Sequence, residues 1–283
     1  MRPGMFGDNQ EQNVGTGAVA VQAGNDVHIT QNGLNMADVK ELTQIFLDRH
    51  LPALRAEAEA TARKHAGEFL DEFVKKLAVA NTVKPEAFAR PDSQACFSSA
   101  LLSSAEKGDQ IDLAMLASMV VARLEQDSAP LLKLVYEEAI AALPRITKEQ
   151  IAFLTFILFT KHITPKHPSV HILELNAQRV MPLIEPGFLL STANREYLCS
   201  KGLLNINLVA DANLMLSNYK RGVPDFPQTD EELIETYPAL NKIIEAYGAD
   251  SLPTCFLTAS GKLIALSALE VAFGKLDMSI WIN

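Results

Sequence analysis

The feature that most constrains this chain is a short, glycine-rich segment near its N-terminus that contains two candidate β-strands. The apolar and turn-forming residues of this segment are Val19, Val21, Val27, Ile29, Gly24 and Gly33. The two valines of the first strand, and the Val-Ile pair of the second, alternate with small or polar residues, which predicts one apolar face on each strand. Gly and Asn tolerate positive φ, so the intervening run Ala23-Gly24-Asn25-Asp26 is typical of a turn. The segment is therefore predicted to be a hairpin or a short solenoid rung.

Two strands of about five residues are not stable alone in water. Their four apolar side chains would contribute roughly 1.5–3 kcal/mol each only if they were fully buried, and unpaired strands leave open edges. The segment must then dock on its own helical body or pair with other copies of the chain. A long predicted helix follows and would carry the segment outward, which favours self-association. Residues 1–33 are accordingly predicted to be a β oligomerisation segment.

The next region, residues 34–144, is predicted to form a helical arm and a bundle. Asn35 is a good N-cap, and an apolar stripe at helical spacing follows it: Val39, Leu42, Ile45 and Phe46. Pro52 is expected to end or kink this helix. Residues 52–80 are rich in Ala and charge and carry a narrow apolar stripe, which indicates a part-exposed helix. That helix is either a coiled-coil arm or an ordinary surface helix of a bundle.

Residues 145–283 are predicted to form an α-rich domain with minor β content, beginning near Pro144. Thr147 and Gln150 have the spacing of a capping box, and the run Ile151–Phe159 is apolar almost all round, as expected of a core helix. Short strands are predicted over residues 203–209 and 255–257, and the tail 276–283 as a terminal strand or a plug in a groove. The fold class is thus mainly α, with a region that could be winged-helix-like.

The composition limits which cellular compartment and which binding partners we expect for this chain. A hydrophobic fraction of 48% and a charged fraction of 21% are those of an ordinary globular protein, and the longest apolar run is shorter than the roughly 20 residues of a membrane span. A net charge of −9 repels polyanions, so nucleic-acid binding would need a local basic face. The three cysteines, Cys96, Cys199 and Cys255, are far apart in the sequence and suit a reducing cytoplasm. No signal segment is apparent, and we expect a cytoplasmic location.

The sequence contains no nucleotide-binding, metalloprotease, nucleophile-elbow or CxxC motif. His162, His167 and His171 lie close together, but Pro168 makes His167 a loop residue and only Glu174 joins them at ligand spacing. A loop histidine cluster of this kind is more often solvated than ligating. The sequence therefore predicts no catalytic residue, no metal site and no cofactor.

Two motifs favour an alternative, a winged-helix DNA-binding regulator. Glu196–Leu204 has the pattern of a helix that ends before a wing strand, and Phe256–Ala265 is similar to the LTxxGxxLA pattern seen in such domains. The basic residues near them are few: Arg195, Lys201, Lys220 and Arg221. Both motifs also serve as packing units in helical proteins that bind no DNA.

The residues already described resemble those of known bacterial proteins. Gln12–Gly15 followed by Val21–Ile29 is similar to the glycine/asparagine-rich β segments at the N-termini of bacterial conflict and phage-defence proteins. Together with the alanine-rich helix, Pro144–Ile151, Leu257–Gly261 and Asp277–Ile282, it resembles an uncharacterised bacterial family named from locus tags. His167–Val170 and the Leu257–Gly261 element also resemble the Abi-alpha abortive-infection family. These resemblances imply a defence-linked role and assign no active site.

The sequence as a whole predicts a non-enzymatic, self-assembling cytoplasmic protein. The resemblance makes it a sensor, adaptor or effector component of abortive-infection-type antiphage defence. The favoured partner is another copy of the chain, with a phage or host protein as a further candidate, rather than nucleic acid or a membrane.

Overall fold

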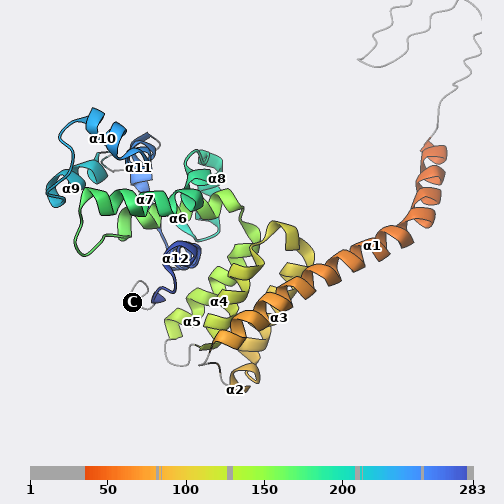
Figure 1. The fold of residues 1–283 in the computed structure, drawn as a ribbon. Helices are drawn as coiled ribbons and strands as arrows, with labels where there is room; N and C mark the ends of the chain where they lie inside the picture. The colour runs from red at the N-terminus through yellow and green to blue at the C-terminus, as the bar shows by residue number, and fades with distance from the viewer. Residues whose placement is uncertain are drawn as a thin grey trace, which may run out of the picture. The chain divides into compact units, whose positions relative to one another are not determined.

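The computed structural model describes residues 36–80, 83, 85–125, 130–207, 211, 213–249 and 252–278 (Figure 1). These residues are mainly helical, and among them two short strands form one antiparallel pair. The predicted mainly α fold class, with minor β content in the C-terminal half, is confirmed. The predicted N-terminal strands, and with them Val19, Val21, Gly24, Val27, Ile29 and Gly33, lie outside the described residues.

Contacts between residues divide the chain into two units, Met1–Arg55 and Ala56–Asn283. The second unit holds one hydrophobic cluster that runs from Phe69 to Leu269 and includes residues on both sides of Pro144. The division predicted at residues 33 and 144 stays a prediction about how the sequence is organised.

Helix α1 extends over Met36–Val79. It continues through Pro52, so of the two predicted outcomes an end of the helix is wrong, and a kink stays a prediction. A proline removes one backbone hydrogen bond, and this 44-residue helix retains its other turns around that gap. Within the second unit, Phe69 and Phe73 of α1 are buried, as the predicted stripe required.

The bundle is completed by four helices: α2 (Pro85–Phe88), α3 (Pro91–Lys107), α4 (Leu113–Glu125) and α5 (Pro130–Ala142). The aromatic rings of Phe69 and Phe73 pack on Phe97 of α3, with centroids 6.0 and 5.0 Å apart. Gly108, in the 3-10 turn η1 (Gly108–Gln110), allows the His65 ring to pack closely, because a Cβ at Gly108 would lie 2.3 Å from His65 Cγ.

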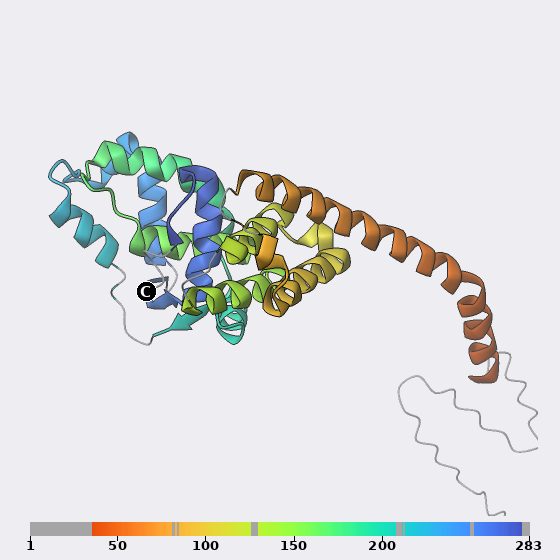
Figure 2. The same ribbon diagram turned by 90° about the horizontal axis from the view of Figure 1, so that it is seen from below.

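Helix α6 (Lys148–His162) is the centre of the second unit. After the 3-10 turn η2 (Leu143–Arg145) it begins with the predicted capping box, and every residue from Ala152 to Phe159 is buried. It crosses α12 (Ala259–Phe273), its most extensive helix neighbour (Figure 2). Both helices are apolar on nearly every side, which is the pattern of helices enclosed by protein.

The remaining elements surround this pair. In chain order they are α7 (Val170–Ile184), η3 (Glu185–Gly187), α8 (Thr192–Ser200), β1 (Leu204–Ile206), α9 (Leu214–Gly222), α10 (Asp230–Thr236), α11 (Pro238–Ala249), η4 (Leu252–Thr254) and β2 (Cys255–Leu257). Strands β1 and β2 pair antiparallel, with Leu204 opposite Leu257 and Ile206 opposite Cys255. Both predicted strands are present, the first shorter than expected within the described residues. The end of the predicted tail segment lies outside them.

Candidate functional site

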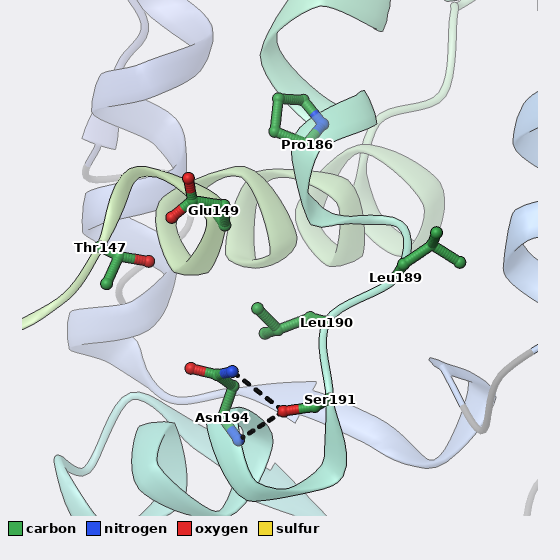
Figure 3. Close-up of a pocket in the computed structure, with 7 residues that line it drawn as sticks. All are labelled: Thr147, Glu149, Pro186, Leu189, Leu190, Ser191 and Asn194. Carbon is green, nitrogen blue, oxygen red and sulfur yellow. Dashed lines mark hydrogen bonds between the residues drawn. The ribbon is translucent and has the colours of Figure 1, made fainter.

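One depression on the surface lies where α6 and α8 begin (Figure 3). Its volume is about 360 Å³. It is lined by Thr147, Glu149, Pro186, Leu189, Leu190, Ser191 and Asn194. We call it the cap pocket, because two of these residues are the N-caps of the helices that form it: Thr147 caps α6 and Ser191 caps α8.

A chain of side-chain hydrogen bonds joins the two caps. The Thr147 amide donates to Gln150 Oε1 at 3.0 Å, and Gln150 Nε2 donates to Asn194 Oδ1 at 2.8 Å. Asn194 Nδ2 in turn donates to Ser191 Oγ at 2.9 Å, as the dashed lines of Figure 3 show. Gln150 is only 3% exposed, so its amide is satisfied within the protein by the two helix starts. The network fixes α8 on the end of α6.

The wall opposite the caps is held by close backbone packing. A Cβ at Gly187 would lie 2.3 Å from the Phe153 nitrogen, so only glycine allows η3 to approach α6 this closely. The ring of the next residue, Phe188, packs against that of Phe156, with ring centroids 4.6 Å apart and the planes tilted by 44°. Leu189 then points into solvent with 94% of its surface exposed, and Leu190 is buried.

Glu149 determines the charge of the cap pocket. A hydrogen bond from the Thr147 hydroxyl lowers the pKa of Glu149, with a further contribution from its own backbone N–H. The carboxylate is therefore ionised at neutral pH, and it occupies the helix N-terminus where an anionic ligand would otherwise bind. The pocket offers hydrogen-bond acceptors next to apolar side chains. Its hydroxyls are engaged as caps, and this arrangement is suited to holding helices together rather than to nucleophilic chemistry.

A second polar cluster lies inside the bundle. Arg123 of α4 is 2% exposed, and its Nη2 donates to Asp92 Oδ2 at 2.7 Å. Its Nε also donates to Glu137 Oε1 at 3.0 Å. The Arg123 hydrogen bond lowers the pKa of Asp92 to about 2. These carboxylates border a shallow depression of about 260 Å³ that also contains Cys96, whose pKa burial raises to about 11. A thiol in this environment stays protonated and unreactive.

Lys161 is a half-buried lysine at the C-terminal end of α6. Its Nζ donates to the carbonyl oxygens of Pro253 and Cys255, each at 2.7 Å, and lies 3.9 Å from the centre of the Phe256 ring. Burial lowers the pKa of Lys161 to about 8. These contacts account for all three ammonium hydrogens, and they secure the outer edge of β2.

The predicted histidine cluster does not form a common site. His162 is half-buried, and burial followed by the nearby Lys262 and Lys161 lowers its pKa. His167 and His171 are exposed, and Glu174 is engaged elsewhere, accepting from the Ala239 and Leu240 amides at the start of α11. Within the described residues, no group of three or more His, Cys, Asp or Glu side chains could hold a metal ion.

The two motifs of the winged-helix hypothesis do come together. β1 follows α8 and pairs with β2, and the Thr258 amide donates to the Leu203 carbonyl at 3.2 Å. Gly261 of α12 packs against the same carbonyl, where a Cβ would lie 2.0 Å from the oxygen. Helices α9, α10 and α11 lie in the connection between the two strands. Of the basic residues near these motifs, Arg195 is buried, Lys201 lies over the Tyr197 ring, and Lys220 and Arg221 end α9.

Sequence reasoning identified the Thr147–Gln150 capping box but missed the pocket, the buried Arg123 and the half-buried Lys161. The signal for Arg123 was a basic residue within the helix Leu113–Glu125, whose only other charged residue is the terminal Glu125. Its partners lie 31 and 14 residues away along the chain, so their identity depended on the fold.

Comparisons with known proteins place the chain in a family. A family model matches residues 33–226, and the chain belongs to that family, which is uncharacterised. Neither the curated proteins nor the solved structures gave a match. In the part of the chain that the structure describes, no helix has both the length and the apolar character needed to cross a membrane.

Proposed function

We propose that this protein assembles with copies of itself through its N-terminal segment, and that the helical body acts as a sensor, adaptor or effector. The observation that carries the proposal is the apolar pattern of residues 19–29, whose four β-branched residues predict two short strands that would not be stable alone. The structure of α1 supports it, because every side chain from Ala56 to Thr61 is exposed. This stretch of helix therefore has no cover from the unit Ala56–Asn283.

Light scattering tests the assembly. The full chain is expected to have a mass several times that of one copy, and a quadruple variant with Ser at Val19, Val21, Val27 and Ile29 is expected to lose this mass. A matched control places Ser at Gln22 and His28, which alternate with the apolar residues. Equal masses for the full chain and the quadruple variant would overturn the proposal.

The setting we propose is antiphage defence of the abortive-infection type. The resemblance of the N-terminal segment to those of phage-defence proteins supports it. At least one phage of a broad panel should form fewer plaques on bacteria that express the full chain. The quadruple serine variant should not protect the bacteria. Full infection by every phage would remove the defence setting and leave the assembly proposal standing.

The junction of α8, β1 and β2 favours DNA binding as a second candidate function. In winged-helix proteins a helix followed by paired strands contacts the duplex. Binding of random duplex DNA that weakens steeply with salt would support this function. The exposed Glu149 and Glu196 near α8 act against it, and binding at physiological salt no stronger than that of a neutral control protein would exclude it.

A further inference from the structure

Helix α1 has a second apolar stripe that its own body does not cover. The inner stripe, His65, Phe69 and Phe73, is buried in the bundle. On another face of the helix Leu70 is 38% exposed and Val74 is 61% exposed. Toward the N-terminus this face continues through Gly67, Arg63, Ala60 and Ala56, of which the last three are exposed. We call the six residues Ala56, Ala60, Arg63, Gly67, Leu70 and Val74 the outer seam.

The outer seam has the spacing of a coiled coil. Its residues alternate at intervals of four and three, which is the heptad pattern with Ala60, Gly67 and Val74 at a and Ala56, Arg63 and Leu70 at d. In the sequence the same register continues toward the N-terminus with Ala53, Phe46 and Val39 at a and with Arg49 and Leu42 at d. The repeat therefore spans about five heptads, with arginine at two of its d positions, Arg49 and Arg63. Three to four heptads are enough to indicate a coiled coil. Val at a and Leu at d, as at both ends of this register, favour two parallel strands.

Another copy of α1 is the occupant that fits this surface. A seam at heptad spacing is complementary to a second helix with the same spacing. The alanines and the glycine in its centre allow two backbones to approach closely. Glu59 falls at g and Lys64 at the next e, so parallel copies in register place opposite charges beside each other. Both side chains are exposed. Glu59 binds Arg63 through Oε1, so its second carboxylate oxygen can accept from Lys64 of the other copy, which would exchange Glu68 for it.

We propose that the outer seam of α1 binds the same seam of a second copy as a parallel two-stranded coiled coil. The parallel direction rests on the proposed function, because N-terminal segments that join copies bring the helices together from the same end. The outer seam is the surface through which an assembly that begins at the N-terminal segments extends along α1. Arg63 at a d position departs from the apolar pattern, and its charge is directed to Glu59 at 2.6 Å.

Cysteine cross-linking in the full chain tests the seam. Ala60→Cys places a thiol at a, and Ala58→Cys places one at f, on the opposite side of the helix. Both alanines are exposed, so neither change disturbs a packed core. With a short bis-maleimide we expect at least tenfold more covalent dimer from A60C than from A58C, independent of tenfold dilution. The unsubstituted chain gives the background from the three native cysteines.

The outcomes separate the seam from the proposed function. If the two variants cross-link equally, or not at all, the parallel seam is overturned. This face would then be covered by an antiparallel copy, by another protein or by another segment of the same chain. If the quadruple serine variant still dissociates in that case, assembly through the N-terminal segment stands alone. A full chain that is monomeric overturns both.

A second measurement uses the exposed apolar residues of the seam. The double variant Leu70→Glu, Val74→Glu should lower the mass measured by light scattering, whereas the control Val271→Glu, at a residue 80% exposed on α12, should leave it unchanged. An unchanged mass in the double variant contradicts the seam.

Discussion

Helices α6 and α1 differ in how much of their apolar surface the chain itself covers. α6 is apolar almost all round, and every residue from Ala152 to Phe159 is buried. α1 has two narrow stripes separated by charged residues, and only the stripe of His65, Phe69 and Phe73 is buried. The comparison shows that a helix with charge on most of its surface can still present an unused apolar face. α6 should therefore determine whether the body folds, and the outer seam of α1 should determine how copies meet.

The largest expected effect is the loss of a core side chain from α6. Leu154 is 0% exposed, so Leu154→Ala should lower the free energy of unfolding by about 2–5 kcal/mol. Leu102→Ala, at a residue 61% exposed on α3, is the matched control and should change it by less than about 0.5 kcal/mol. Denaturant unfolding followed by circular dichroism measures both. Equal losses of unfolding free energy in the two variants would mean that the buried side chains of α6 stabilise the fold no more than exposed ones do.

Charged residues sharpen the same comparison. Arg123 is buried between two carboxylates, whereas the Arg63–Glu59 pair on α1 has side chains that are 79% and 58% exposed. Arg123→Ala should lower the unfolding free energy by about 2–3 kcal/mol. This is less than the loss expected when a fully enclosed ion pair is broken, because Asp92 and Glu137 can regain contact with water. Arg63→Ala should cost less than about 0.5 kcal/mol. A loss at Arg63 as large as that at Arg123 would show that α1 is not the open helix described.

The helical pattern was predictable because it depends on local sequence. The capping box at Thr147, the apolar run Ile151–Phe159 and the aromatic stripe of α1 all follow from residues within a few positions of one another. Pro52 shows the limit of local rules, because a long helix tolerated the loss of one hydrogen bond there. The sequence predicted a single narrow stripe over residues 52–80, and the register of the outer seam was recognised only once the structure showed that Leu70 and Val74 are exposed.

The sites could not be predicted in the same way. Gln150 meets Asn194 across 44 residues, and Lys161 meets the Pro253 carbonyl across 92. Nothing in the local sequence around either residue names its partner, since the pairing arises only when α6 packs beside α8 and η4. Glycine contacts are similar, because Gly187 and Gly261 matter through a backbone that comes close only in the folded chain.

Close packing against α12 gives the next effect. A Cβ at Gly261 would lie 2.0 Å from the Leu203 carbonyl oxygen, so Gly261→Ala must displace β1 or α12. We expect a loss of about 1–3 kcal/mol in unfolding free energy, measured by denaturant titration. Gly222→Ala is a control, since nothing lies within 4 Å of the added carbon in the helix α9. A neutral Gly261→Ala would show that the β1–α12 contact adjusts freely.

Acid should weaken the bundle through Asp92. The pKa of Asp92 is lowered from 3.8 to about 2 in the folded protein, so the ionised carboxylate stabilises the fold above pH 3.8. That contribution is lost as the pH falls from about 4 through 2. Asp92 is 40% exposed at its side chain, which makes the effect modest. The melting temperature should therefore fall more steeply over this pH range for the native chain than for Asp92→Asn. Parallel plots of melting temperature against pH for the two proteins would contradict the role assigned to Asp92.

The smallest effect, and the only expected gain, is at Gly67 on α1. No atom lies within 4 Å of a Cβ added there, and the residue has helical neighbours on both sides. Gly67→Ala should therefore raise the unfolding free energy by about 0.5–1 kcal/mol, because alanine loses less backbone entropy in a helix. Gly67 also lies at an a position of the outer seam, where an added methyl group contacts a second helix if one is present. In the full chain the gain in melting temperature should then grow with protein concentration, whereas a gain that is the same at all concentrations would place Gly67 on a face that no copy covers.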